Sequence, residues 1–168
     1  MAPGESAMIS TSVLQLRRRW IFGCLSILMM ALIFGFSAMP GKESAAMSGQ
    51  VTQVVVQAVY PDYSSLPRQE KAGAYRLMEH LVRKSAHLTE YAVLGALLTL
   101  FFSTFTFKGR FLAALICAAL YAASDEWHQA FVADRGPLLN DVLIDTAGAS
   151  LGVILALLLV LAFRKKRT

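Results

Sequence analysis

Three short stretches hold most of the residue types that could bind a ligand or transfer a proton. They read KSAHLTEY from residue 84, SDEWHQAFVADRG from residue 124 and NDVLID from residue 140. All three contain carboxylates, and the first two add histidine and basic side chains. Such groups can perform acid–base chemistry, bind a divalent cation or hold an anion.

Helical spacing lets members of these stretches share a face. Lys84, His87 and Tyr91 are three or four residues apart, and Asp141 and Asp145 are four apart. If the three stretches meet, they form one polar site. The candidate ligand-binding residues are then Lys84, His87, Glu90, Tyr91, Asp125, Glu126, His128, Gln129, Arg135, Asp141 and Asp145.

Long apolar runs must position these residues. The 168-residue chain is 56% hydrophobic, whereas roughly 45–50% is usual for soluble proteins. A helix of about 20 apolar residues crosses a bilayer. Four runs reach or approach that length, and we predict an all-α, integral membrane four-helix bundle. The predicted spans are residues 20–38, 86–105, 111–131 and 141–163.

Basic residues indicate the orientation of these spans. They cluster before the first run, in the link between the second and third runs, and after the last run. Because cytoplasmic segments are enriched in Lys and Arg, we predict that both termini are cytoplasmic. Residues 1–19 and 164–168 are then cytoplasmic tails, and residues 20–163 form the membrane domain. The net charge of +5 is explained by topology, and nucleic-acid binding is not expected.

The segments outside the spans have their own patterns. Residues 1–16 are expected to be a disordered tail. Residues 44–60 and 69–85 read as short amphipathic elements on the outer face. The second of these either lies on the membrane surface or continues directly into the second span. This topology puts all three polar stretches at the outer ends of spans two, three and four.

Some of the ionisable residues lie inside the apolar runs. Glu90 and Asp145 are each about one helical turn from the outer end of a span. Facing lipid would cost such a residue about 2.5–3.5 kcal/mol, so we expect both to face the bundle interior with a partner. The natural pairs join Glu90 to His87, and join Lys84 or Arg135 to Asp125, Asp141 or Asp145.

Individual residues also have simpler explanations. Asn140 or Asp141 could cap a helix, Trp127 and Tyr91 could be interfacial aromatic residues, and Lys84 could extend to the membrane surface. It is the coincidence of so many polar residues in one layer that indicates a pocket.

Three kinds of pocket fit these residues. A divalent metal could use His87, His128 and two carboxylates. Alternatively, His87 or His128 could be a catalytic base. Glu90 or Asp125 would then orient the base, and Lys84 or Arg135 would hold an anion. In the third kind of pocket, the same groups bind a ligand without chemistry.

The same residues resemble a known family. KSAHLTEYAVLGALL, YAASDEWHQAFVADRG and DVLIDTAGASLG, preceded by FSAMPGKES, are similar to the signature blocks of VanZ-like membrane proteins. The resemblance covers about residues 20–162. It implies a small four-helix bacterial membrane protein. The family's name comes from a protein linked to resistance to teicoplanin, a lipid-bearing glycopeptide, and it implies no particular reaction.

These arguments lead to one functional expectation and two alternatives. We expect a multi-pass plasma-membrane protein whose outward-facing pocket binds a polar or anionic cell-envelope molecule, lipid-linked or glycopeptide, and affects glycopeptide susceptibility. The first alternative is a membrane-embedded hydrolase or transferase acting on a phosphate- or sugar-bearing lipid. The second is a scaffold in which the polar cluster only ties the helices together. The sequence does not choose between enzyme and binder, and it specifies neither a cofactor nor an oligomeric state.

Overall fold

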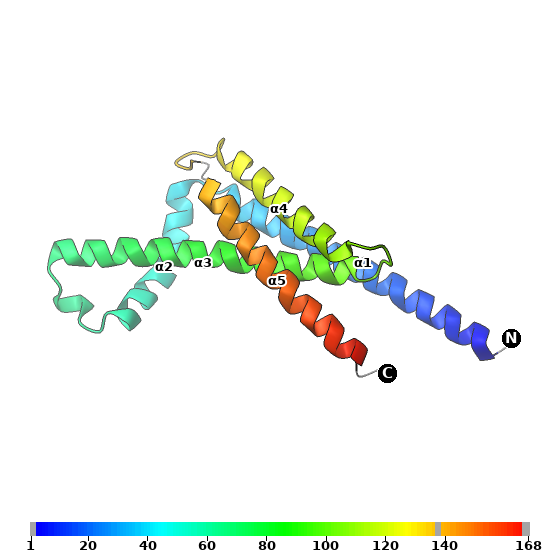
Figure 1. The fold of residues 1–168 in the computed structure, drawn as a ribbon. Coiled ribbons are helices and arrows are strands. Elements are labelled where there is room, and N and C mark those ends of the chain that lie inside the picture. Colours follow the sequence, from blue (N-terminus) through cyan, green and yellow to red (C-terminus); the bar gives the residue numbers. More distant parts are fainter. Residues whose placement is uncertain (1–2, 137–138, 166–168) are drawn as a thin grey trace.

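The computed structural model describes residues 3–136 and 139–165 of the chain. Within these ranges it contains five α-helices, one 3₁₀ helix and no strand, which confirms the all-α prediction (Figure 1). The elements in chain order are α1 (Pro3–Ser37), α2 (Gly41–Val59), η1 (Tyr63–Ser65), α3 (Arg68–Phe102), α4 (Arg110–Gln129) and α5 (Leu139–Lys165).

Two helices are longer than the apolar runs that predicted them. α1 already begins at Pro3, so the expectation of a disordered segment over residues 1–16 is wrong. α3 is continuous from Arg68, so the amphipathic segment 69–85 and the second apolar run form a single helix. No proline interrupts this stretch, and prolines precede it at its N-terminal end. At 1.5 Å per residue, α3 is about 52 Å long, well beyond the roughly 30 Å hydrocarbon layer.

Three helices of the described chain are long and apolar enough to cross a membrane. They are Ser12–Ser37, Arg68–Phe102 and Leu139–Phe163. The helix predicted at residues 111–131 is present as α4, but it stops at Gln129 and carries Asp125 and Glu126 near its end. α5 extends through Lys165, and residues 166–168 of the predicted basic tail lie outside the described residues.

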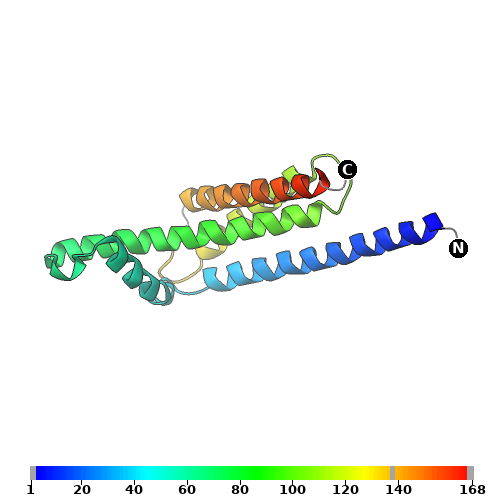
Figure 2. The same ribbon diagram turned by 90° about the horizontal axis from the view of Figure 1, so that it is seen from below.

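α3 is the central element of the fold. It packs against α1, α2, α4 and α5, and α4 also packs against α5. Figures 1 and 2 show that α2 crosses the first half of α3 obliquely and that η1 lies in the connection between the two helices. In both views the start of α1, the link between α3 and α4, and the end of α5 lie toward the same end of the molecule. The link between α1 and α2 lies at the other end of α1.

The closest helix contact joins α3 to α5 through glycines. A Cβ atom placed on Gly152 would lie 1.8 Å from the carbonyl oxygen of Ala92, and one on Gly148 would lie 2.3 Å from that of Leu88. Gly148 and Gly152 are four residues apart, the spacing that lets two membrane helices touch through their backbones. The contact places Asp145, almost one turn before Gly148, beside the α3 turn that carries His87.

Further contacts hold the two ends of the helices together. At one end the guanidinium of Arg19 lies 4.0 Å from the ring centre of Phe105 and donates to the carbonyl of Thr104. At the other end the backbone N–H of Gly41 donates to the carbonyl of Ala133 (3.0 Å). A Cβ atom on Gly41 would lie 2.3 Å from the carbonyl oxygen of Asp134. The link between α1 and α2 is therefore packed directly onto the link between α4 and α5.

The glycine contact generates a stability prediction. Gly152→Ala should lower the free energy of unfolding by about 1–3 kcal/mol, because the added methyl group forces α3 and α5 apart. The matched control is Gly35→Ala in α1, where an added Cβ has no neighbour within 4 Å among the described residues. That variant should be neutral or slightly stabilising, since alanine favours helix. Unfolding in detergent measures both; equal stability of the two variants would contradict the glycine contact.

Candidate functional site

The structure brings the three polar stretches together where the end of α4 and the start of α5 lie beside the middle of α3. α3 contributes residues 84–91, the last turns of α4 contribute residues 125–129, and the first turns of α5 contribute Asp141 and Asp145. This convergence follows from the fold, because α5 begins where α4 ends and both pack against α3. The residues of the predicted site therefore lie in one region of the molecule, where they form several separate groups of contacts.

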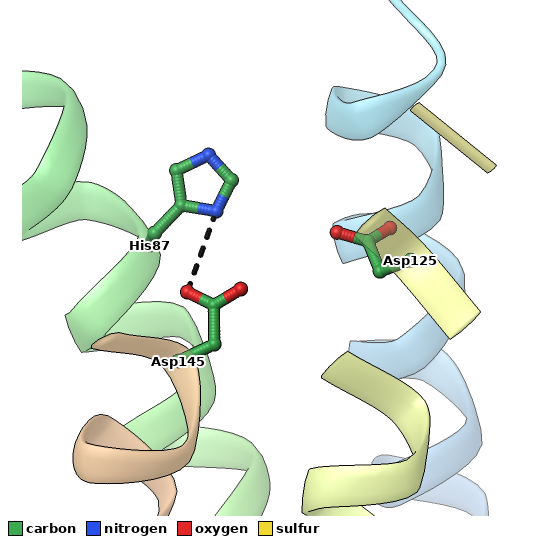
Figure 3. Close-up of side chains that lie close together, drawn as sticks. All are labelled: His87, Asp125 and Asp145. Atoms are coloured by element: carbon green, nitrogen blue, oxygen red, sulfur yellow. Dashed lines mark ion pairs between the residues drawn. The ribbon is translucent and has the colours of Figure 1, made fainter. Parts of the chain in front are cut away.

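A histidine and two aspartates lie close together in this region (Figure 3). His87 from α3, Asp125 from α4 and Asp145 from α5 each offer one ligand atom, and these atoms lie within 4.8 Å of one another. The Nδ1 atom of His87 is 3.6 Å from Oδ1 of Asp145. Asp145 is completely buried and Asp125 is 2% exposed. Two carboxylates thus share one enclosed space with a single imidazole.

Asp125 is held in place from α1. Its Oδ2 atom accepts hydrogen bonds from the Ser37 hydroxyl (2.8 Å) and from Nε2 of Gln129 (3.2 Å). The same Gln129 nitrogen also donates to the Ser37 oxygen (3.2 Å). Hydrogen bonds to a charged acceptor are shorter and stronger than those between neutral groups. This network explains why the FSAMP segment belongs with the polar blocks: Ser37 is the last residue of α1 and orients Asp125.

Two of the predicted charge pairings can be checked. Lys84 and Asp141 form a mostly buried ion pair between α3 and α5, which confirms one of the pairings predicted for Lys84. The expected pairing of His87 with Glu90 is wrong: His87 faces Asp145 instead. Residues three apart on a helix point in similar directions, so Glu90 shares the face of His87 but turns toward the space beside α2.

Arg135 lies at the edge of the site, in the link between α4 and α5. One of its guanidinium nitrogens, Nη2, donates to the carbonyl of Phe36 at the end of α1 (3.3 Å). Burial lowers the pKa of Arg135, and the positive charge of Arg83 lowers it further. An arginine stays charged even so. Two guanidinium groups therefore face the same region and would be stabilised by an anion.

The remaining predicted residues surround this core. Tyr91 is completely buried, and its ring centre is 6.3 Å from that of Tyr121. Glu126 is 3% exposed at the end of α4. His128 stacks on Phe34, with ring centres 4.5 Å apart, and does not join His87, Asp125 and Asp145. The metal set with both histidines, one of the sequence hypotheses, is therefore not assembled.

A large cavity adjoins the polar cluster between α1, α2 and α3. Its volume is about 1100 Å³, and its walls are mainly apolar. The α2 side is a stripe of side chains spaced three or four apart, and four ionisable residues also line the cavity. The lining includes Met47, Val51, Val55 and Val59 from α2, together with Arg83, His87, Glu90 and Arg135. His87 therefore borders both the cavity and the buried aspartates.

Our sequence reasoning missed part of this site. Arg83 was not among the chosen residues, although it lies four residues before His87 on the same helical face. Ser37 and the α2 stripe were also missed. The stripe had a readable signal in the helical spacing of Met47, Val51 and Val55. Ser37 had none beyond its place in the FSAMP block of the family resemblance.

Long apolar helices around a buried polar cluster define a helical membrane protein. A family model described as VanZ/LLP1 matches residues 22–161, most of the chain. The chain belongs to the VanZ/LLP1 family, which confirms the resemblance seen in its polar blocks. Neither a curated protein nor a solved structure gives a significant match to this chain.

The Ser37 contact can be tested by a matched pair of serine variants. Ser37→Ala should cost about 1.5–3 kcal/mol of unfolding free energy, because it removes a hydrogen bond to a buried carboxylate. The control is Ser26→Ala, also in α1 and also buried, whose hydroxyl only donates to the Phe22 carbonyl of its own helix. In an Asp125→Asn background the Ser37→Ala loss should shrink. Equal losses for the two serines, measured by unfolding in detergent, would contradict the assigned role.

Proposed function

We propose that this VanZ/LLP1-family membrane protein binds an anionic, amphiphilic molecule of the bacterial cell envelope in the cavity between α1, α2 and α3. One observation supports this proposal above the others: a mainly apolar cavity of about 1100 Å³ is also lined by two arginines, Arg83 and Arg135. Apolar walls suit an acyl or prenyl chain, and the arginines suit a phosphate or carboxylate head group.

The shape of the cavity favours a chain-bearing ligand. Pockets for small molecules usually measure roughly 300–1000 Å³ and are lined mostly by apolar side chains with a few polar groups. With about 1100 Å³, this cavity slightly exceeds that range. Its apolar wall runs along α2 from Met47 to Val59, over about three turns of helix. An extended hydrocarbon chain matches such a wall better than a compact polar solute does.

The charges favour an anionic head group. The planar guanidinium of arginine binds carboxylate and phosphate oxygens in pairs. Arg83 and Arg135 come from different segments, and Arg83 forms an ion pair with Glu79 at 3.6 Å. Glu90 and His87 lie in the same lining and could accept hydrogen bonds from hydroxyl or amine groups of the ligand.

We further propose four spans, with both termini in the cytoplasm and the polar cluster facing outside. The basic residues support this orientation. Arg17, Arg18 and Arg19 directly precede the first predicted span, where Arg19 donates to the Thr104 carbonyl. Lys108 and Arg110 lie in or beside the same link between α3 and α4. By the positive-inside bias the end of the molecule that holds this link is the cytoplasmic end. α4 is then an additional span, the third in chain order, and neighbouring helices support its less apolar final turns.

Family membership supplies the cellular context of the proposal. The family's link to teicoplanin, a glycopeptide carrying a lipid chain, agrees with a cavity for an amphiphile. We propose that the ligand is a lipid-linked envelope molecule or such a glycopeptide, and that occupancy of the cavity alters glycopeptide susceptibility.

A membrane hydrolase or transferase is the second candidate. It is favoured by His87, whose ring borders the cavity while its Nδ1 atom faces Asp145. A base oriented by a carboxylate beside a ligand cavity is an arrangement common in acid–base catalysis. Under this alternative His87→Gln would abolish conversion of a phosphate- or sugar-bearing lipid while leaving its binding largely intact. A pure binder would never convert its ligand.

Ligand retention tests the main proposal. The protein, extracted in native lipid particles, should carry an anionic amphiphile that mass spectrometry identifies. Arg83→Gln and Arg135→Gln should each reduce its retention by about tenfold or more, because each removes a charge-assisted contact. Arg76→Gln, an exposed arginine on α3 outside the cavity, should change nothing. Equal retention by all variants, with equal melting temperatures, would refute a role for the two arginines.

Reporter fusions test the proposed orientation. At the C-terminus, a reporter that works only in the cytoplasm should be active. At residues 61–66, between α2 and α3, a reporter that works only outside the cytoplasm should be active. This expectation rests on the basic residues at the opposite end of α3. An external C-terminus would reverse the orientation and place the cavity's charged lining on the cytoplasmic side.

A further inference from the structure

We propose that His87, Asp125 and Asp145 bind a divalent transition-metal ion. The site shares His87 with the lining of the proposed ligand cavity, but neither Arg83 nor Arg135 belongs to it. It joins three helices, α3, α4 and α5, which come together only in the folded protein (Figure 3).

The arrangement of ligand atoms is close to that of a metal site. One atom from each residue lies within 4.8 Å of the other two, and Nδ1 of His87 is 3.6 Å from Oδ1 of Asp145. Ligands bound at about 2.0–2.2 Å to a tetrahedral ion lie about 3.4 Å apart. The histidine–aspartate pair already has nearly this separation. Side-chain rotations that close the set by about 1 Å would complete it.

Unsatisfied polar atoms supply independent support. Asp145 is completely buried, yet neither of its carboxylate oxygens accepts a hydrogen bond in the described part of the chain. Oδ1 of Asp125 and Nδ1 of His87 are likewise buried without a hydrogen-bond partner there. Most buried polar atoms in proteins have a partner, and an ion is one explanation for those that do not. Four such atoms belong to these three side chains.

Neighbouring charges do not replace the ion. A protonated His87 would balance only one of the two carboxylates, whereas a divalent cation balances both. Lys84 is engaged by Asp141, and among the described residues neither Asp125 nor Asp145 forms an ion pair with a lysine or an arginine. Ser37 and Gln129 both donate to Oδ2 of Asp125, which leaves its Oδ1 atom for coordination. Hydrogen bonds of this kind commonly orient metal ligands.

The ligand types indicate the class of ion. Mg²⁺ and Ca²⁺ are bound mainly through oxygen, while a mixed imidazole–carboxylate set suits ions such as Zn²⁺, Mn²⁺ or Co²⁺. Three protein ligands leave a coordination position for water or for an oxygen of a bound molecule. Because His87 also lines the cavity, the ion would lie directly behind the cavity wall.

Metal binding by purified protein tests this site. The protein carries an affinity tag without histidine and is depleted of metal, then titrated with Zn²⁺, Mn²⁺ or Co²⁺ alone. About one ion should bind per chain, and Co²⁺ should give the visible absorption of an imidazole–carboxylate site. His87→Gln, Asp125→Asn and Asp145→Asn should each weaken binding by about tenfold or more. His80→Gln and Asp134→Asn, at exposed positions, are the matched controls and should bind as the wild type does.

A stability measurement guards against variants that fail to fold. Added metal should raise the melting temperature of the wild type and of both controls, because an ion that binds only the folded state stabilises it. It should not raise that of the three site variants. The proposal is overturned if the folded wild type shows no metal-dependent shift and no Co²⁺ spectrum, or if the site variants bind as tightly as the controls. Lipid retention, tested with Arg83 and Arg135, is a separate measurement and can succeed or fail independently.

Discussion

The backbone contact between α3 and α5 is the constraint on which the rest of the structure depends. Gly148 and Gly152 have no side chain to hold the helices apart, so α5 rests directly on the carbonyls of Leu88 and Ala92. This contact sets the register of the two helices. With any other register, Asp145 would not lie beside the α3 turn that carries His87. Small residues in α5 therefore determine where the charged residues meet.

Because the carboxylates of the polar cluster are buried, their compensation by neighbouring groups is the important property of the cluster. A carboxylate inside an apolar helical layer is costly unless other groups compensate its charge. Asp141 is compensated by Lys84, and Asp125 is partly compensated by Ser37 and Gln129. Among the described side chains, Asp145 has an ion-pair partner only in the His87 ring, while the carboxylate of Asp125 lies nearby. The cluster is thus unevenly satisfied, and its least satisfied part lies next to the ligand-sized cavity. This pattern fits a binding function better than a purely structural one.

Particular residues show how much of the structure could be predicted from the sequence. Hydrophobic run length correctly indicated the helices around Trp20–Ser37 and Leu139–Phe163, because a run of that length has few alternatives to a membrane-type helix. The expected charge pairs included Lys84 with Asp141 as one of several alternatives, and the structure forms that pair. Helical spacing failed for Glu90, since a shared helical face does not say which neighbour stands opposite. It also gave no warning that His128 would stack on Phe34, a residue far away in the chain.

The sequence by itself determined the all-helical class, the family and the set of polar residues, because each of these follows from composition or from local pattern. Only the tertiary structure decided which of those residues contact one another. It grouped His87 with two aspartates from other helices, gave Asp125 a partner at the end of α1, and built a cavity against α2. The physical reason is that such contacts depend on the approach and register of separate helices. In this protein, the helix register depends on close glycine contacts between α3 and α5. The local sequence around these glycines does not indicate which helix they will contact.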